Sequence, residues 1–170
     1  MKTLVAIILL IITLGSTSGF AQQKSRKQLK EEKKLEKQEQ VEQLVNARCF
    51  VFNAQNAIPM GFKSVNISTS SYTVKFFPEL IDCYLPYFGQ GYAGGGYGSG
   101  EGIKFSGKPD EFTFTKEKKN YMFNAVYKGD KDTYRLSLSV SFSGSATLTV
   151  TTNYRSSISF NGYITPPEAP

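Results

Sequence analysis

Every second residue is apolar along two stretches in the last third of the chain. From residue 134 to 142, aromatic and aliphatic side chains alternate with Arg and Ser, and from 146 to 151 Ala, Leu and Val alternate with Thr. A period of two predicts half-buried strands that turn one face toward a core. Between these stretches, Ser143 and Gly144 suit a tight hairpin because glycine tolerates positive φ. Residues 158–164 predict a further strand after a turn, so this region is predicted to be an antiparallel meander.

Six shorter runs of the same character precede the meander and are separated by clusters of Gly, Pro, Asn or Ser. They are residues 50–53, 64–67, 72–77, 103–105, 111–115 and 121–127. All the runs together predict about nine strands within about 120 residues, with a long helix only in front of them. The sequence therefore predicts a mainly β fold, an antiparallel β-sandwich or partly closed barrel, preceded by one charged N-terminal α-helix.

The predicted helix is strongly polar. Residues 24–42 are nearly all Lys, Arg, Glu or Gln, which are good helix formers, and their three aliphatic residues recur every six positions instead of forming one stripe. At the end of this segment, Val41, Leu44 and Val45 have the i, i+3, i+4 spacing of one helix face and can dock the last turns on the following domain. A polar helix of this kind is typical of a solvated spacer, and a basic arm for an anionic partner is the alternative.

The N-terminal 21 residues have the three parts of a secretory signal peptide. Lys2 supplies a positive charge, residues 4–14 are apolar, and Gly19 and Ala21 occupy the small-residue positions of a cleavage site. The apolar run is too short to span the roughly 30 Å of bilayer hydrocarbon as a permanent anchor, and no later run is long enough to be a transmembrane segment. The sequence thus predicts cleavage near Ala21 and a periplasmic or secreted mature chain.

Composition divides the remainder of the chain. Of the 13 Phe and 10 Tyr residues, all but Phe20 lie after Cys49. We therefore expect a charged helical lead-in at residues 22–46, a β-domain at 47–165 and a Pro-rich tail at 166–170, after the signal peptide at 1–21. The formal net charge of +6 discriminates little between partners: it is compatible with an anionic envelope surface, solvated surface lysines are the simpler interpretation, and an exported protein is not expected to bind nucleic acid.

The missing histidines exclude several classes of enzyme and site. The chain has no His and two Cys, so it lacks the usual general base of Ser and Cys hydrolases and cannot form a standard structural zinc site. The Gly-rich stretch 89–102 lacks the Gly-Lys-Ser/Thr end of a phosphate-binding loop and the strand-to-helix context of a dinucleotide-binding turn. We expect no metal and no cofactor.

The same Gly-rich stretch supplies the candidate binding residues. Tyr92 and Tyr97 lie among its glycines, and Tyr84 and Tyr87 lie just before it. Such a segment can lay aromatic faces on a small molecule, a glycan or a peptide, or it can be an ordered surface loop whose rings cover the edge of the core. The first function hypothesis is accordingly an exported, non-enzymatic binding module for such a ligand or for an envelope protein.

Two other functions are compatible with the sequence. A hydrolase that uses two carboxylates would draw them from the acidic residues outside the charge runs, and no spacing brings any pair of these together. Those residues are Glu79, Asp82, Glu101, Asp110 and Glu111. A structural envelope protein whose helix pairs with a partner is the remaining alternative.

The two cysteines are candidates for a disulfide. An exported chain enters an oxidising compartment, and an even number of cysteines without His to share a metal favours pairing. Cys49 lies at the predicted junction of helix and strand, and Cys83 lies among apolar neighbours that suggest burial. The sequence predicts a bond between them.

Five segments of the exported part carry a resemblance to a known family. They read FVFNAQNAIPMG (50–61), YLPYFGQGY (84–92), GIKFSGKPDEF (102–112), SGSATLTV (143–150) and SISFNGYI (157–164). With these motifs in this order, the chain resembles the bacterial family catalogued as domain of unknown function forty-two fifty-one. The resemblance implies a secreted protein of a gut-type Gram-negative bacterium, covers the whole exported part, and implies no catalytic residues.

Overall fold

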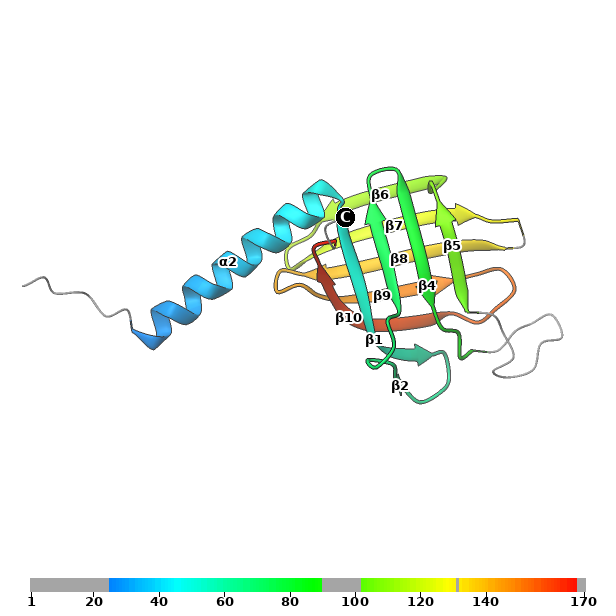
Figure 1. Cartoon of the computed structure of the whole chain (residues 1–170), viewed down its shortest axis with the longest axis horizontal. Coiled ribbons are helices and arrows are strands. Elements are labelled where there is room, and N and C mark those ends of the chain that lie inside the picture. Colours follow the sequence, from blue (N-terminus) through cyan, green and yellow to red (C-terminus); the bar gives the residue numbers. More distant parts are fainter. Residues whose placement is uncertain (1–24, 90–101, 131, 168–170) are drawn as a thin grey trace, which may run out of the picture. The chain divides into compact units, whose positions relative to one another are not determined.

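A single helix and an antiparallel sheet make up the described part of the chain. The computed structural model describes residues 25–89, 102–130 and 132–167, and in these residues α2 (Arg26–Ala47) precedes ten strands (Figure 1). The strands are β1 (Phe50–Pro59), β2 (Val65–Asn66), β3 (Thr73–Phe77), β4 (Leu80–Leu85), β5 (Ile103–Gly107), β6 (Glu111–Lys116), β7 (Asn120–Lys128), β8 (Thr133–Ser141), β9 (Ser145–Thr151) and β10 (Ile158–Thr165). The predicted mainly β fold with one preceding helix is confirmed. The predicted signal peptide lies outside the described residues.

The strands form one sheet that curls into a partly closed barrel. Their order is β5-β4-β3-β1-β10-β9-β8-β7-β6, all neighbours are antiparallel, and β2 pairs with β1 off this path. Figure 1 shows β1, β3, β4 and β5 crossing in front of β6 to β9. Because β5 and β6 each have one hydrogen-bonded neighbour, the sheet ends at these two edges and the barrel stays open between them.

The long strand β1 joins the two layers of the curled sheet. Its first residues pair with β3, residues 51–59 pair with β10, and the register with β10 shifts between Ala54 and Asn56. At the shift, Gly162 lies so close to the chain that a Cβ there would collide with the carbonyl oxygen of Asn53. A glycine at this position therefore permits the bulge that bends the sheet.

Aromatic side chains fill the inside of the barrel. The ring of Phe50 lies 5.0 Å from that of Phe76 and 5.2 Å from that of Phe123, and Phe114 lies 4.8 Å from Phe123. The first three rings are almost completely buried; buried residues from eight strands form this core, and Phe112 and Phe114 of β6 pack against it. The interior is thus a packed core, so ligand sites have to be sought at the ends and on the outside of the barrel.

The ends of α2 are capped by local hydrogen bonds. At the N-terminus, Ser25 and Gln28 exchange side-chain and backbone hydrogen bonds in a capping box. At the C-terminus, Arg48 adopts a positive φ of 51°, while the N–H of Cys49 donates to the carbonyl of Leu44. This is a Schellman arrangement with arginine at the position that glycine usually takes, so the sequence carried no glycine signal for the end of the helix.

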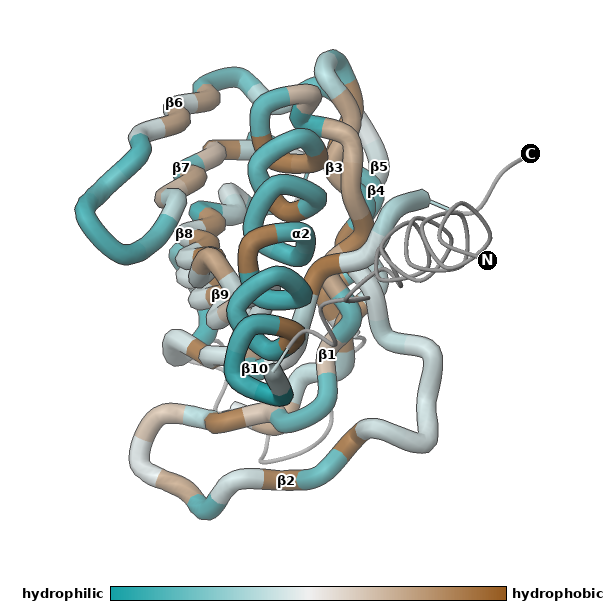
Figure 2. The backbone as a smooth tube through the Cα atoms, turned by 90° about the vertical axis from the view of Figure 1, so that its left-hand side faces the viewer, coloured by the Kyte–Doolittle hydropathy of each residue, from teal (hydrophilic) through white to brown (hydrophobic). Residues whose placement is uncertain are grey.

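The last turns of α2 dock on the barrel. Val41 and Val45 are buried, and Leu44 packs against the same core, as the i, i+3, i+4 spacing predicted. The rest of the helix is mainly hydrophilic (Figure 2). Among the residues that the structure describes, no helix has the length and apolar character that crossing a bilayer requires.

The predicted disulfide is absent from the structure. Cys49 and Cys83 are free thiols, the first half-buried and the second buried. Strand β3 lies between β1 and β4, and its Val74 pairs with both Phe52 of β1 and Cys83 of β4. Cys83 is therefore level with Phe52, which follows Cys49 by three residues. Two strand spacings and three residues of rise separate the Cα atoms by on the order of 14 Å, twice the roughly 7 Å that a disulfide tolerates. The expected burial of Cys83 and the oxidising compartment both favoured a disulfide. Neither argument takes into account that strand β3 lies between the two cysteines.

Candidate functional site

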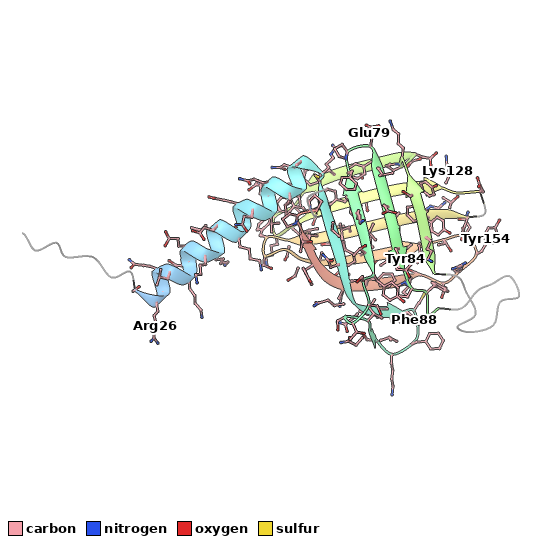
Figure 3. The ribbon with its side chains drawn as sticks, viewed as in Figure 1. Arg26, Glu79, Tyr84, Phe88, Lys128 and Tyr154 are labelled. Atoms are coloured by element: carbon pink, nitrogen blue, oxygen red, sulfur yellow. The ribbon has the colours of Figure 1, made fainter. Side chains whose placement is uncertain are left out.

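A cavity of about 540 Å³ opens at one end of the barrel. Its wall is formed by the start of β5, the loop from β7 to β8, and the loop from β9 to β10. We call it the mouth site, and the side chains that give it its character are Lys104, Phe105, Tyr127, Asp130, Asp132, Tyr134, Tyr154 and Arg155. Figure 3 shows Tyr154 at the end of the barrel where Lys128 also lies.

Three stacked rings form the inner wall of the mouth site. Phe105 lies 4.5 Å from Tyr127 with an interplanar angle of 13°, and 4.9 Å from Tyr134 with an angle of 27°. Tyr127 and Tyr134 are directly opposite each other in the β7–β8 hairpin, and Phe105 comes from β5 in the other layer. The curl of the sheet therefore brings an edge strand over a hairpin end and stacks its ring there.

Glycine and burial fix two of these rings. A Cβ on Gly107 would approach Cε2 of Tyr127 to 2.7 Å, so the ring fits against bare backbone on β5. Burial is the main cause that raises the pKa of Tyr134, with the charge of Asp132 adding to it and that of Arg155 opposing it. The Tyr134 hydroxyl consequently stays protonated at neutral pH and can donate a hydrogen bond.

Charged groups of both signs surround the aromatic wall. Oδ1 of Asp132 accepts backbone hydrogen bonds from Thr133 at 2.8 Å and Asn153 at 3.0 Å, which ties the β7–β8 loop to the β9–β10 loop. The guanidinium of Arg155 lies 5.1 Å from the centre of the Tyr87 ring. Lys104 of β5 also lines the cavity, and its Nζ lies 4.7 Å from the centre of the Tyr84 ring. The residues that line the site therefore include carboxylates, cations and aromatic rings.

The predicted tyrosines have different environments. Tyr84 is 45% exposed on β4, where its ring lies 5.4 Å from Tyr72 and Lys104 Nζ lies 4.7 Å above it. Tyr87 is buried, and its hydroxyl donates to the carbonyl of Ser156 at 3.0 Å. Neither lines the mouth site, although each contacts a cation that does. Tyr92 and Tyr97 lie outside the described residues.

The predicted catalytic carboxylates do not meet in the mouth site. Glu79 pairs with Lys108, Asp82 lies 3.9 Å from Lys75, and Asp110 lies 4.0 Å from Lys128. Glu111 is exposed at the start of β6, and Glu101 lies outside the described residues. The carboxylates of the mouth are Asp130 and Asp132 instead. Within the described part of the chain, no three His, Cys, Asp or Glu residues are arranged to hold a metal ion.

Sequence reasoning missed the residues of the aromatic wall. Phe105, Tyr127 and Tyr134 all belong to runs that predict strands, and an aromatic residue in a strand is ordinarily interpreted as core. The available signal was the pair of tyrosines at the facing ends of two predicted strands, separated by a short segment with Gly and Asp; a hairpin there places the two rings side by side at one end of the sheet.

Known proteins share this architecture. The family model described as "Domain of unknown function (DUF4251)" matches residues 32–164. A crystal structure of a DUF4251 family protein from Bacteroides eggerthii DSM 20697 has a similar fold, with a TM-score of 0.61 and 16% identity over 76% of this chain and 87% of that chain. No curated protein matches the chain. At this identity the structural likeness shows the fold alone.

Proposed function

The chain belongs to the DUF4251 family, and on the geometry of the mouth site we propose that it is an exported binding domain whose ligand is a saccharide. One observation carries the proposal: a single cavity of about 540 Å³ combines aromatic faces with carboxylates and cations. Export is supported by the charged start, apolar run and small residues of positions 1–21, with cleavage near Ala21 and a periplasmic or secreted mature protein.

A sugar ring matches both kinds of group in the mouth site. Its C–H faces pack on aromatic rings, and its hydroxyls around the rim both donate and accept hydrogen bonds. Tyr154 is 55% exposed in the β9–β10 loop and offers a ring face at the edge of the cavity. Asp130 can accept hydrogen bonds from the sugar hydroxyls, while the protonated Tyr134 can donate to them. The volume falls within the roughly 300 to 1,000 Å³ of ordinary ligand sites.

The direct test measures binding of defined oligosaccharides by isothermal titration calorimetry. The mature chain is titrated with neutral, amino and acidic oligosaccharides, and the best ligand is then titrated against two variants. Tyr154→Ala removes a mouth ring and should weaken binding about tenfold, which corresponds to roughly 1.4 kcal/mol. Tyr163→Ala removes a ring of similar exposure, 42%, that lies on β10 outside the mouth, and should leave the affinity unchanged.

Other outcomes would replace this proposal. If none of the oligosaccharides binds, or if Tyr154→Ala and Tyr163→Ala weaken binding equally, the mouth is not a saccharide site. Sugar released as new reducing ends during the titration would instead show hydrolysis, with Asp130 and Asp132 as the first carboxylates to replace by Asn.

A further inference from the structure

A second cavity, of about 570 Å³, lies between the docked part of α2 and the barrel. The C-terminal half of the helix forms one wall, and the β8–β9 turn and the end of β10 form the other. We call this cavity the helix groove. It shares no lining residue with the mouth site, so its occupant is independent of the saccharide proposal.

The floor of the helix groove is apolar. Val41, Leu44 and Ala47 line it from α2, and Ile164 lines it from β10. Pro167 adds a ring beyond the end of the strand. Such a surface gains free energy by burying methylene groups.

Among the described residues that line the helix groove, the charge is positive. Lys37 lies at its edge, and none of the described residues that line it is acidic. The other polar groups at the edge are amides and hydroxyls, such as those of Gln40 and Ser143, which can donate hydrogen bonds. The groove therefore matches a molecule with an apolar tail and one anionic head.

From this complementarity we infer that the helix groove binds a single-chain anionic amphiphile of the fatty acid class. The acyl chain lies against Val41, Leu44, Ala47 and Ile164, and the carboxylate lies beside Lys37. Each methylene that enters the groove contributes about 0.8 kcal/mol, which is about a fourfold gain in affinity. The affinity for octanoate, decanoate and dodecanoate should accordingly rise by about sixteenfold at each step of two methylenes.

Cys49 provides a built-in reporter of occupancy. Its half-buried thiol lines the helix groove, whereas Cys83 is buried in β4, where burial raises the pKa of its thiol. In the folded protein, N-ethylmaleimide should therefore react with Cys49 and spare Cys83. A bound acyl chain should slow the labelling of Cys49 in proportion to occupancy, and Cys49→Ser removes the signal.

The experiment combines this labelling with two matched pairs of variants, all at fatty acid concentrations below micelle formation. Ala47→Trp fills the groove and should abolish binding, while Asn46→Trp, at the neighbouring exposed position outside the groove, should not. Lys37→Glu should weaken dodecanoate binding about fivefold, while Lys33→Glu makes the same charge change one helical turn away and should have no effect. Thermal melts confirm that each variant is folded.

Three results would overturn the inference. Affinity that does not change with chain length would exclude burial of the tail, and equal binding by Ala47→Trp and the unmodified protein would exclude the groove. Cys49 protection without added fatty acid that disappears when the chain ends at Pro167 would show that the chain's own last residues occupy the groove.

Discussion

Val41 on α2 packs directly against Gly144 in the β8–β9 turn. Gly144 has a φ of +87°, and a Cβ built on it would lie 3.2 Å from Cγ2 of Val41. One turn later on the same helix face, Val45 is completely buried. The last two turns of the helix are thus part of the core, and the side chains before them contribute little apolar surface to it.

Deleting residues 22–40 should leave a folded domain because Val41 and Val45 remain. The removed segment is almost wholly polar, so the melting temperature should fall by less than about 5 °C, on the order of 1 kcal/mol for a domain of this size. Circular dichroism melts measure this. The matched longer deletion of residues 22–46 removes both valines and should destabilise the domain strongly; equal melting temperatures for the two deletions would mean that the helix contacts are dispensable.

Replacing Gly144 by Ala should destabilise the protein through both backbone strain and the contact with Val41. The left-handed backbone alone costs about 1–2 kcal/mol for a residue with a Cβ. Gly61→Ala is the matched control, since Gly61 has a φ of +81° and no atom within 4 Å of the added Cβ. Urea unfolding should therefore show a larger loss of unfolding free energy for Gly144→Ala than for Gly61→Ala. Combining Gly144→Ala with Val41→Ala should reduce this difference. Equal losses of stability at both glycines would mean that backbone strain alone, and not the contact with Val41, causes the destabilisation.

The sequence alone predicted the structure correctly where the local hydrophobic pattern agrees with the position of the residues in the fold. In β8 and β9, Leu138 and Leu148 point inward and the residues between them point outward, because the period of two already encodes which face is buried. The turn at Gly144 and the docking face of α2 follow from equally local rules. Fold class was therefore predictable from spacing alone.

The mouth site and the cysteines depend on contacts that no local pattern contains. Phe105 meets Tyr134 only because the sheet curls until an edge strand lies over the β7–β8 hairpin. The disulfide prediction was wrong for the same reason, because the interposition of β3 between Cys49 and Cys83 is a property of strand order. The helix groove likewise needs a helix and a strand end that are distant in sequence.

The β8–β9 hairpin should respond very differently to substitutions on its two faces. Leu138 and Leu148 are completely buried and pair across the strands, so replacing either by Ala should cost roughly 2–5 kcal/mol. Ser139→Ala and Thr149→Ala remove only side-chain hydrogen bonds on the outer face, to Asn120 and Ser159, and should cost under about 1 kcal/mol. Urea unfolding gives all four values, and similar costs on both faces would mean that a partner or another layer covers the outer face.

Stability at alkaline pH should depend on Tyr134. Burial raises the pKa of its hydroxyl above the value of about 10 expected in the unfolded chain, so the folded state holds this proton more tightly. The resulting stability is fully present below about pH 10 and is lost as pH rises through the folded pKa. Tyr134→Phe should therefore lose less stability between pH 9 and pH 11 than the unmodified protein in urea titrations. Tyr154→Phe, an exposed control from the same end of the barrel, should follow the unmodified curve.

Cys49 and Cys83 should differ in their reactivity toward a thiol reagent in the unreduced protein. In the folded, unreduced protein, N-ethylmaleimide should modify one thiol per chain, at Cys49, because Cys83 is buried and burial raises the pKa of its thiol. After unfolding in urea the count should rise to two, since strand β3 keeps the cysteines too far apart to pair. Mass spectrometry gives both counts, and Cys49→Ser should reduce the folded count to none. If the unfolded, unreduced monomer has no reactive thiols, Cys49 and Cys83 do form a disulfide. Strands β1 and β4 would then have to be neighbours in the sheet.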